Sequence, residues 1–312
     1  MTLTMPLIAT LATASVIVDR WIGEPRTAHP LVAFGKLAAA IETRLNTGVR
    51  ARLMGIVAWL LAVAPPVAIA AWLVAVLPFL YACALHVALL WFALGARSLH
   101  DHIAPIARAL VKRDLAQARA LTSRIVSRET AHADEAELSR AAVESALENG
   151  NDAIFGALFW FALLGGPGAL AFRLANTLDA MWGYRTPRYL RFGWAAARFD
   201  DVLNWIPARL TAASYALLGD TRNALRCWRE QAPRWDSPNA GPVMASGAGS
   251  LNVQLGGPAV YHGAIEQRPT LGMGRTATAQ HVMAALTLVE RSVFLWLAVL
   301  IVLALLGVSF DV

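Results

Sequence analysis

Paired carboxylates at helical spacing are the first feature of this sequence that could do chemistry. Glu144 and Glu148 stand four residues apart in the segment ADEAELSRAAVESALEN, where Asp134 followed by Glu137 predicts a helix that starts with a capping box. Residues at this spacing share one helix face, so the two carboxylates lie side by side. The pair is either part of a solvated face with ion pairs or a functional pair, because the segment runs straight into an uncharged stretch where a carboxylate is costly.

Further polar side chains recur at helical spacing after that uncharged stretch. They are Arg173, Asn176 and Asp179, followed by Asp200, Asp201 and Asn204. Hard oxygen ligands of this kind suit Mg²⁺, which is usually held by one or two carboxylates together with substrate phosphates. Adjacent aspartates are also common at ordinary helix starts, so the pattern alone leaves both a metal site and a simple helix start open.

Two other features have more than one interpretation. His29 follows Asp19 and Glu24 after an uncharged stretch, and it is either a binding residue or part of a polar turn that closes a helix. Residues 237–261 are rich in Gly, Ser and Pro, and we expect a flexible loop whose backbone N–H groups could cradle a phosphate. The sequence contains no Walker A motif, so no nucleotide site is placed by motif.

The composition places these polar groups in a membrane protein. Of the 312 residues, 57% are hydrophobic and 15% are charged, with a mean hydropathy of +0.50. Soluble domains typically have about 45–50% apolar and about 25% charged residues. Disordered proteins, nucleic-acid modules and disulfide-stapled secreted scaffolds are therefore excluded. The two cysteines form no CxxC motif, which argues against a structural zinc site.

The uncharged segments predict the helices that must position the polar groups. Residues 1–18 predict a first span or anchor, and residues 54–96 are long enough for two helices, with a break at Pro65–Pro66 or near Pro78. Residues 292–310 predict a terminal span. Residues 153–172 form either a span that ends in the turn at Gly165–Gly168 or a buried helix, and residues 202–218 predict a buried or interfacial helix.

We therefore predict an all-α, polytopic integral membrane protein with about four to five hydrophobic helices and helical cytoplasmic connections. A single membrane domain over residues 1–312 would comprise hydrophobic helices at 1–97, a region with most of the motifs at 98–290 and a C-terminal span at 291–310. The Arg-rich residues 19–52 follow a segment without Lys or Arg, so the positive-inside rule puts them in the cytoplasm. We expect residues 153–172 to pack within the protein instead of crossing the membrane. The polar stretches before and after this segment would then both lie on the cytoplasmic side.

Four segments resemble, in order, the motifs of the CobD/CbiB family of cobalamin biosynthesis, membrane proteins that are taken to be adenosylcobinamide-phosphate synthases. The segments are DRWIGEPRTAHPLVAFGKL, AAVESALENGNDAIFGALFWFALLGGPGALAFRLANTLDAMWGYR, RFGWAAARFDDVLNWIPARLTA and SPNAGPVMASGAGSLNVQLGGPAVYHG. The blocks N-T-L-D-x-M-x-G-Y-R and D-D-V-L-N-x-x-P-A-R-L are long and specific. In one departure, many relatives have E-N-T-V-D-G where this chain has ENGNDA from Glu148 onward, which keeps the carboxylates and alters their loop.

The resemblance implies an ATP-dependent amide ligase in a bacterial inner membrane, with its active site facing the cytoplasm. It would join adenosylcobyric acid to aminopropanol or its O-phosphate, with ATP and Mg²⁺ as cofactors, to give adenosylcobinamide or its phosphate. Implied partners are the lipid bilayer and other membrane proteins of cobalamin assembly, and no nucleic acid. The chemistry needs cations beside the transferring phosphoryl group and a base that keeps the amine neutral.

The residues that match the motifs and suit this chemistry fall into three groups. The implied catalytic residues are Glu144, Glu148, Asp179 and Asp201. The implied ligands of substrate and phosphate are His29, Arg128, Arg173, Asn176, Arg185, Asn204 and Arg209, and the implied metal ligands are Asp200 and Asp201.

Two other functions fit a polytopic membrane chain. AmpE-like inner-membrane sensor or regulatory proteins resemble the same family distantly, but a pure signalling role does not need this clustering of carboxylates and amides. A small-solute transporter would use intramembrane Glu and Asp as coupling groups, and it would show inverted hydropathy repeats, which are absent from this sequence. The ligase is therefore favoured.

Overall fold

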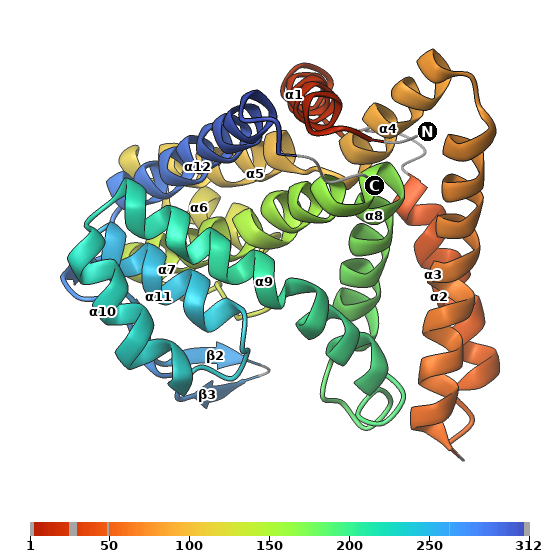
Figure 1. Cartoon of the computed structure of the whole chain (residues 1–312). Helices are drawn as coiled ribbons and strands as arrows, with labels where there is room; N and C mark the ends of the chain where they lie inside the picture. The colour runs from red at the N-terminus through yellow and green to blue at the C-terminus, as the bar shows by residue number, and fades with distance from the viewer. Residues whose placement is uncertain (1–2, 25–29, 49, 262, 309–312) are drawn as a thin grey trace. The chain divides into compact units, whose positions relative to one another are not determined.

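Helices dominate the computed structural model, which describes residues 3–24, 30–48, 50–261 and 263–308 (Figure 1). The α-helices within these residues are α1 (Met5–Ile22), α2 (Pro30–Leu45), α3 (Ala51–Val76), α4 (Phe79–Ala93), α5 (Ala96–Val111), α6 (Leu115–Thr122), α7 (Glu135–Gly150), α8 (Gly156–Trp182), α9 (Trp194–Leu218), α10 (Thr221–Gln231), α11 (Ala240–Ser250) and α12 (Ala279–Leu305). A π-helical turn, Asn151–Phe155, joins α7 to α8, and a 3-10 turn, Ala232–Arg234, follows α10.

Five helical stretches among the described residues are long and apolar enough to cross a membrane. They are Met5–Ile22, Ala51–Val76, Phe79–Val111, Glu135–Trp182 and Ala279–Leu305. This confirms the predicted all-α polytopic architecture. The break within residues 54–96 lies at Pro78, where α3 ends and α4 begins, whereas Pro65 and Pro66 are accommodated inside α3. Helix α9, which covers residues 202–218, is not among the candidate spans.

The chain packs as two compact units that interleave along the sequence. The first unit comprises Met1–Ala96, Asp152–Asn204 and Leu297–Val312, and the second comprises Arg97–Asn151 and Trp205–Trp296. The predicted subdivision followed chain order, whereas each of these units is assembled from separated stretches. Helices α9 and α12 each contribute residues to both units.

The first unit is built around α8, which packs against α3 and α4. Alanines of α3, such as Ala58 and Ala62, allow the large buried side chains of α8, Leu178 and Trp182, to pack closely in the core. The glycine-rich turn predicted within residues 153–172 is a kink at Gly165, where α8 leaves helical geometry. The Nδ1 atom of His86 in α4 accepts the N–H of Gly166 at 2.8 Å, so the donor freed by the kink is satisfied.

A loop between α8 and α9 also packs onto α3 in the first unit. The loop's Arg188 forms an ion pair with Glu42 of α2, with 2.6 Å between Nη2 and Oε2, and Trp182 stacks edge to face with Phe192. A Cβ atom at Gly55 of α3 would lie 2.0 Å from the carbonyl oxygen of Phe192, so only glycine allows this approach.

The second unit has α11 at its centre, and α10 lies beside it (Figure 1). Every residue of α11 from Ala240 to Ser250 is buried. The side chain of Ser246 donates to the carbonyl of Ala212 at 2.6 Å, and that of Ser250 donates to the carbonyl of Tyr215 at 2.7 Å. The expectation of a flexible loop over residues 237–261 is therefore wrong for 240–250, where the small residues form a helix that lets its neighbours approach closely.

Short strands follow α11 and precede α12 in the second unit. Strand β1 (Val253–Gly256) pairs with β4 (Thr270–Leu271) in antiparallel and with β5 (Arg275–Thr276) in parallel orientation. Strands β2 (Ala259–Tyr261) and β3 (Ala264–Glu266) form an antiparallel hairpin. Helix α7 begins with the predicted capping box, in which Asp134 Oδ1 accepts the N–H of Glu137 at 2.8 Å and Glu137 Oε2 accepts the N–H of Asp134 at 2.9 Å.

The close approach at Gly55 yields a stability prediction. A Gly55→Ala substitution should destabilise the protein by about 1–3 kcal/mol, because the added methyl group displaces the loop backbone at Phe192. The matched control is Gly35→Ala in α2, where a Cβ would lie 3.8 Å from the Met181 sulfur, an ordinary contact. Thermal unfolding in detergent measures both variants, and equal melting temperatures would contradict the packing described here.

Candidate functional site

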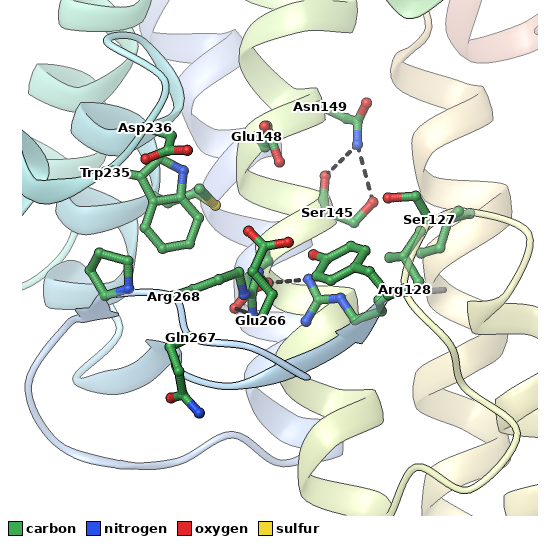
Figure 2. A pocket seen from close by; sticks show the side chains of 16 residues that line it. Ser127, Arg128, Ser145, Glu148, Asn149, Trp235, Asp236, Glu266, Gln267 and Arg268 are labelled. Carbon is green, nitrogen blue, oxygen red and sulfur yellow. Dashed lines mark hydrogen bonds and ion pairs between the residues drawn. The ribbon is translucent and has the colours of Figure 1, made fainter. Parts of the chain in front are cut away.

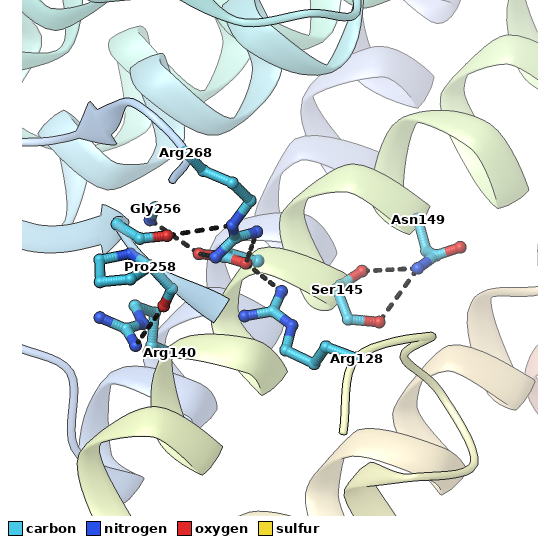
Figure 3. Close-up of polar contacts among 9 residues, drawn as sticks. Arg128, Arg140, Ser145, Asn149, Gly256, Pro258 and Arg268 are labelled. Carbon is cyan, nitrogen blue, oxygen red and sulfur yellow. Dashed lines mark hydrogen bonds and ion pairs between the residues drawn. The ribbon is translucent and has the colours of Figure 1, made fainter. Parts of the chain in front are cut away.

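A buried carboxylate that binds two guanidinium groups lies at the centre of the second unit. Glu144 of α7 forms ion pairs with Arg128 and with Arg268, the latter at 3.1 Å between Oε2 and Nη1. Its Oε1 atom also accepts the N–H of Gly256 at 2.7 Å. Figure 3 shows the guanidinium groups of Arg128 and Arg268 converging here from separate segments of the chain. One negative charge therefore faces two positive charges in a site almost closed to water, since the Glu144 side chain is 3% exposed.

The loop between α6 and α7 positions Arg128. The next residue, Glu129, donates its backbone N–H to the carbonyl of Val260 at 2.8 Å, and its Oε1 atom accepts the N–H of Gly263 at 2.6 Å. The hydroxyl of Thr130 donates to the carbonyl of Arg119 at 3.1 Å. These bonds fix the loop between the β2–β3 hairpin and α6, so Arg128 has little freedom to leave Glu144.

The segment between β3 and β4 positions Arg268. Its Nε donates to the carbonyl of Gly257 at 3.1 Å, and its guanidinium carbon lies 5.5 Å from the centroid of the Trp235 ring. Gly256 and Gly257 adopt positive φ angles of 72° and 75°. At Gly256 this conformation turns the N–H toward Glu144, and a Cβ would lie 2.0 Å from the carbonyl oxygen of Pro269.

These arginines border a cavity of about 410 Å³ in the second unit (Figure 2). The side chains that line it come from the α6–α7 loop, from α7, from the turn after α10, from α11 and from the hairpin region. They are Ile125, Val126, Ser127, Arg128, Glu144, Ser145, Glu148, Asn149, Trp235, Asp236, Met244, Tyr261, Glu266, Gln267, Arg268 and Pro269. The lining thus combines two cations, several carboxylates and an apolar wall.

Glu148 is the second α7 carboxylate that borders this cavity. It lies one helical turn beyond Glu144, as the spacing predicted, and it is half-buried. Its carboxylate makes no hydrogen bond or ion pair among the described residues, in contrast to the carboxylate of Glu144. Nearby Asn149 donates its Nδ2 to the carbonyl and the hydroxyl of Ser145, at 2.9 and 3.1 Å. Glu148 is thus available to a ligand, whereas Glu144 is occupied in holding the arginines.

A cluster of aspartates and asparagines lies in the first unit. Asp200 accepts hydrogen bonds from the Nδ2 atoms of Asn176 and Asn204, at 3.3 and 3.1 Å. Burial raises the pKa of Asp200 well above its ordinary range, and the charges of Asp152 and Asp179 raise it further. The pKa of Asp201 is also raised by burial, against the opposing effect of Arg198, whose Nη1 lies 3.2 Å from Asp201 Oδ2. Burial and the neighbouring carboxylates therefore favour the uptake of a proton or another cation at Asp200.

Arginines border this cluster within the first unit. Arg173 pairs with Glu24 at 3.5 Å, and it also interacts electrostatically with Asp152. Its Nε atom is buried and has no hydrogen-bond partner among the described residues. Arg185 is exposed in the loop after α8, and its positive charge acts to lower the pKa of Asp201.

The donor set fits a metal that arrives with a phosphate. Within the described residues no group of three or more His, Cys, Asp or Glu side chains is arranged to hold a metal ion. Asp200 and Asp201 could supply the one or two carboxylates that Mg²⁺ takes when substrate phosphates complete its coordination shell, and the amides of Asn176 and Asn204 hold the Asp200 carboxylate in place. These residues thus fit Mg²⁺ bound to a nucleotide better than a metal held by protein ligands alone.

The residues predicted from the sequence therefore gather in two places. Arg128, Glu144 and Glu148 come together in the second unit, and Arg173, Asn176, Asp179, Asp200, Asp201 and Asn204 come together in the first. Arg209 lies outside the cavity lining, where it donates to the carbonyl of Trp205 at 2.7 Å and to Asn239 Oδ1 at 3.1 Å, and so holds the segment that precedes α11. His29 lies outside the described residues.

Sequence reasoning missed the residues that complete the cavity. Arg268 and Trp235 stand in polar stretches whose spacing carries no helical or motif signal, and Glu266 and Tyr261 lie on a short hairpin. The one available signal was the pair of glycines before Pro258, which marks a turn of unusual backbone geometry.

Removal of the Glu144 charge should be far more damaging to stability than removal of the Glu148 charge. A Glu144→Gln substitution leaves two buried guanidinium groups without a counter-charge and should cost about 3–5 kcal/mol of unfolding free energy. Glu148→Gln breaks no ion pair and should leave stability within about 1 kcal/mol of the original. Thermal unfolding compares them with Arg226→Gln, which breaks an exposed pair. Equal losses in the two glutamate variants would contradict the assigned roles.

The raised pKa of Asp200 predicts a pH-dependent effect on stability. Between about pH 4, the value for an unfolded aspartate, and the higher native pKa of Asp200, the native state binds more protons than the unfolded state. Stability therefore falls as pH rises through this window. The melting temperature of Asp200→Asn relative to the original should improve as pH rises.

The control for this prediction is Asp220→Asn, because the pKa of Asp220 is lowered by the backbone N–H of Asn223 and by other hydrogen bonds. The stability that Asp220 contributes is present above its unfolded pKa and disappears as pH falls. Below about pH 4, the relative melting temperature of Asp220→Asn should therefore fall as pH rises, which is opposite in sign to the change expected for Asp200→Asn above about pH 4. A flat difference for Asp200→Asn across the window would contradict the pKa assignment.

Comparison with known proteins assigns the chain to a family. The profile of the family described as CobD/Cbib protein matches residues 12–289. The chain is similar to Cobalamin biosynthesis protein CobD of Stutzerimonas stutzeri, with 55% identity over 92% of this chain and 95% of the relative. It is also similar to the proteins of the same name from Chromobacterium violaceum, with 52% identity over 94% and 95%, and from Mycobacterium tuberculosis, with 40% identity over 87% and 88%. No solved structure matches the chain. The chain belongs to the CobD/CbiB family of cobalamin biosynthesis proteins.

Proposed function

We propose that this protein is an ATP-dependent amide ligase that joins adenosylcobyric acid to aminopropanol or aminopropanol phosphate. The product would be adenosylcobinamide or its phosphate. Family membership and the name of its relatives support a role in cobalamin biosynthesis. The observation that carries the reaction class is the cavity of the second unit, where a carboxylate without an ion-pair partner borders the same space as two anchored guanidinium groups.

The chemistry of amide formation explains the need for such a cavity. A carboxylate is a poor electrophile. Transfer of the γ-phosphoryl group of ATP to it would release ADP and give an acyl phosphate, whose carbonyl carbon the amine attacks. The amine must lose a proton before or during attack, and Glu148 is the candidate that takes it. The bond between carbon and the phosphate oxygen then breaks and phosphate leaves. Arg128 and Arg268 can stabilise oxyanions in this space.

The aspartate cluster of the first unit is the candidate site for Mg²⁺ and the nucleotide phosphates. When bound, Mg²⁺ would offset the negative charge of the transferring phosphoryl group. Asp200 and Asp201 would hold it, Asn176 and Asn204 would orient the carboxylate of Asp200, and Arg173 would contact a phosphate through its unpartnered Nε atom. Asp179 raises the negative potential of the cluster.

The proposed function would put the active site on the cytoplasmic side of a bacterial inner membrane. ATP and the corrinoid substrate are cytoplasmic, and the Arg-rich connections around residues 19–52 favour the same side. Association with other membrane proteins of cobalamin assembly would keep the product within the pathway.

A reconstituted activity assay tests the proposal. The protein in membranes, supplied with adenosylcobyric acid, aminopropanol phosphate and Mg-ATP, should form the amide only when all three are present. Glu148→Gln and Asp201→Asn should each lower turnover by about 100-fold or more, because the first loses the base and the second a metal ligand. Arg226→Gln, an exposed residue of α10, serves as the control. Unchanged turnover in both variants would remove these site assignments, and no product with the unaltered protein would overturn the function.

A further inference from the structure

We infer that the cavity of the second unit binds a small zwitterion, with its oxyanion at Arg128 and Arg268 and its ammonium group at Glu148. This inference deepens the proposed function, because it assigns the amine substrate to one cavity. The role of the bound molecule as the amine substrate rests on the proposed function. The binding itself is predicted from the geometry of the cavity alone.

The positive end of the cavity is formed by the ion cluster of Glu144, Arg128 and Arg268, which has one more positive than negative charge. Glu144 supplies one negative charge to two guanidinium groups, whose side chains are 12% and 9% exposed. The Nε atom of Arg128 is buried and has no hydrogen-bond partner among the described residues. An oxyanion in the cavity would neutralise the remaining charge and accept hydrogen bonds from guanidinium N–H groups, which bind phosphate and carboxylate in forked geometry.

The negative end of the cavity lies along the same helix. Glu148 stands four residues after Glu144, about 6 Å farther along the axis of α7. Its carboxylate borders the cavity without an ion-pair partner among the described residues. Asp236 and Glu266, labelled with it in Figure 2, add negative charge to the lining. A cation that occupied this end would be attracted, and a second anion would be repelled.

The remaining walls suit a short aliphatic link between the two charges. Trp235 and Met244 supply apolar surface, and the Trp235 ring also holds the Arg268 guanidinium at 5.5 Å from its centroid. The cavity volume of about 410 Å³ lies near the lower end of the range for small-molecule sites, about 300–1,000 Å³. It accommodates a molecule with an amine, a short chain and an oxyanion.

Binding without ATP tests this inference on the full-length protein in detergent. Isothermal titration would compare O-phosphoethanolamine with ethanolamine, inorganic phosphate and β-alanine. The protein should bind O-phosphoethanolamine at least about tenfold more tightly than ethanolamine or phosphate, because only the zwitterion engages both ends. Comparison with β-alanine tells whether the oxyanion is a phosphate or a carboxylate. Equal affinity for inorganic phosphate and O-phosphoethanolamine would overturn the inference.

Three variants separate the two ends of the cavity. Glu148→Gln should bring the affinity for O-phosphoethanolamine close to that for phosphate, and Arg128→Gln should weaken both phosphate-bearing probes by about tenfold. Arg226→Gln, in an exposed ion pair of the same unit, should change neither affinity. Thermal unfolding identifies a variant that fails to fold. Glu148→Gln breaks no ion pair and is expected to fold, so the test does not depend on the stability of Arg128→Gln. Unchanged affinities in Glu148→Gln would refute the assignment of the ammonium group.

The same experiments distinguish failure of this inference from failure of the proposed function. Zwitterion binding without amide formation from Mg-ATP and adenosylcobyric acid would leave the inference standing and overturn the function. Amide formation with a KM for the amine that Glu148→Gln leaves unchanged would support the function and overturn the inference.

Discussion

The buried carboxylate of Glu144 is the interaction on which the second unit depends. A carboxylate closed off from water is tolerated only with counter-charges and hydrogen bonds, and here these come from Arg128, Arg268 and the backbone of Gly256. The three partners lie in separate segments, so one side chain of α7 joins the loop before that helix to the strands far beyond it. The same contact holds two guanidinium groups at the edge of the cavity. Stability of the unit and the chemistry of its cavity therefore have a common origin.

The two carboxylates of α7 show how environment divides roles between identical side chains. Glu144 is surrounded by cations and a backbone donor, so its oxygen atoms are fully engaged. One turn away, Glu148 borders open space and has no ion-pair partner within the described chain. The aspartates of the first unit follow the opposite principle, since burial and the charges of Asp152 and Asp179 raise the pKa of Asp200 and so oppose its ionisation.

Hydropathy and helix-start chemistry predicted most of the fold, because both act locally. The capping box at Asp134 and Glu137 marked the start of α7, and the uncharged stretches predicted the apolar helices. The i, i+4 spacing correctly placed Glu144 and Glu148 on one face. The flexible loop predicted within residues 237–261 is instead a helix, because small residues pack tightly when neighbouring helices cover them. The hydrogen bonds of Ser246 and Ser250 to the neighbouring helix show this packing. Arg268 and Trp235 could not be predicted, since only long-range packing brings them to α7.

The interleaved arrangement of the units has a consequence for how the protein is made. Helix α12 gives its first part to the second unit and its last residues to the first, and α9 is divided in the same way. Neither unit can complete its packing while the ribosome still holds the end of α12. The partners described for Glu144 and Asp200 precede α12 in the chain, so these polar contacts can form first, and the last helix then completes the apolar packing of both units.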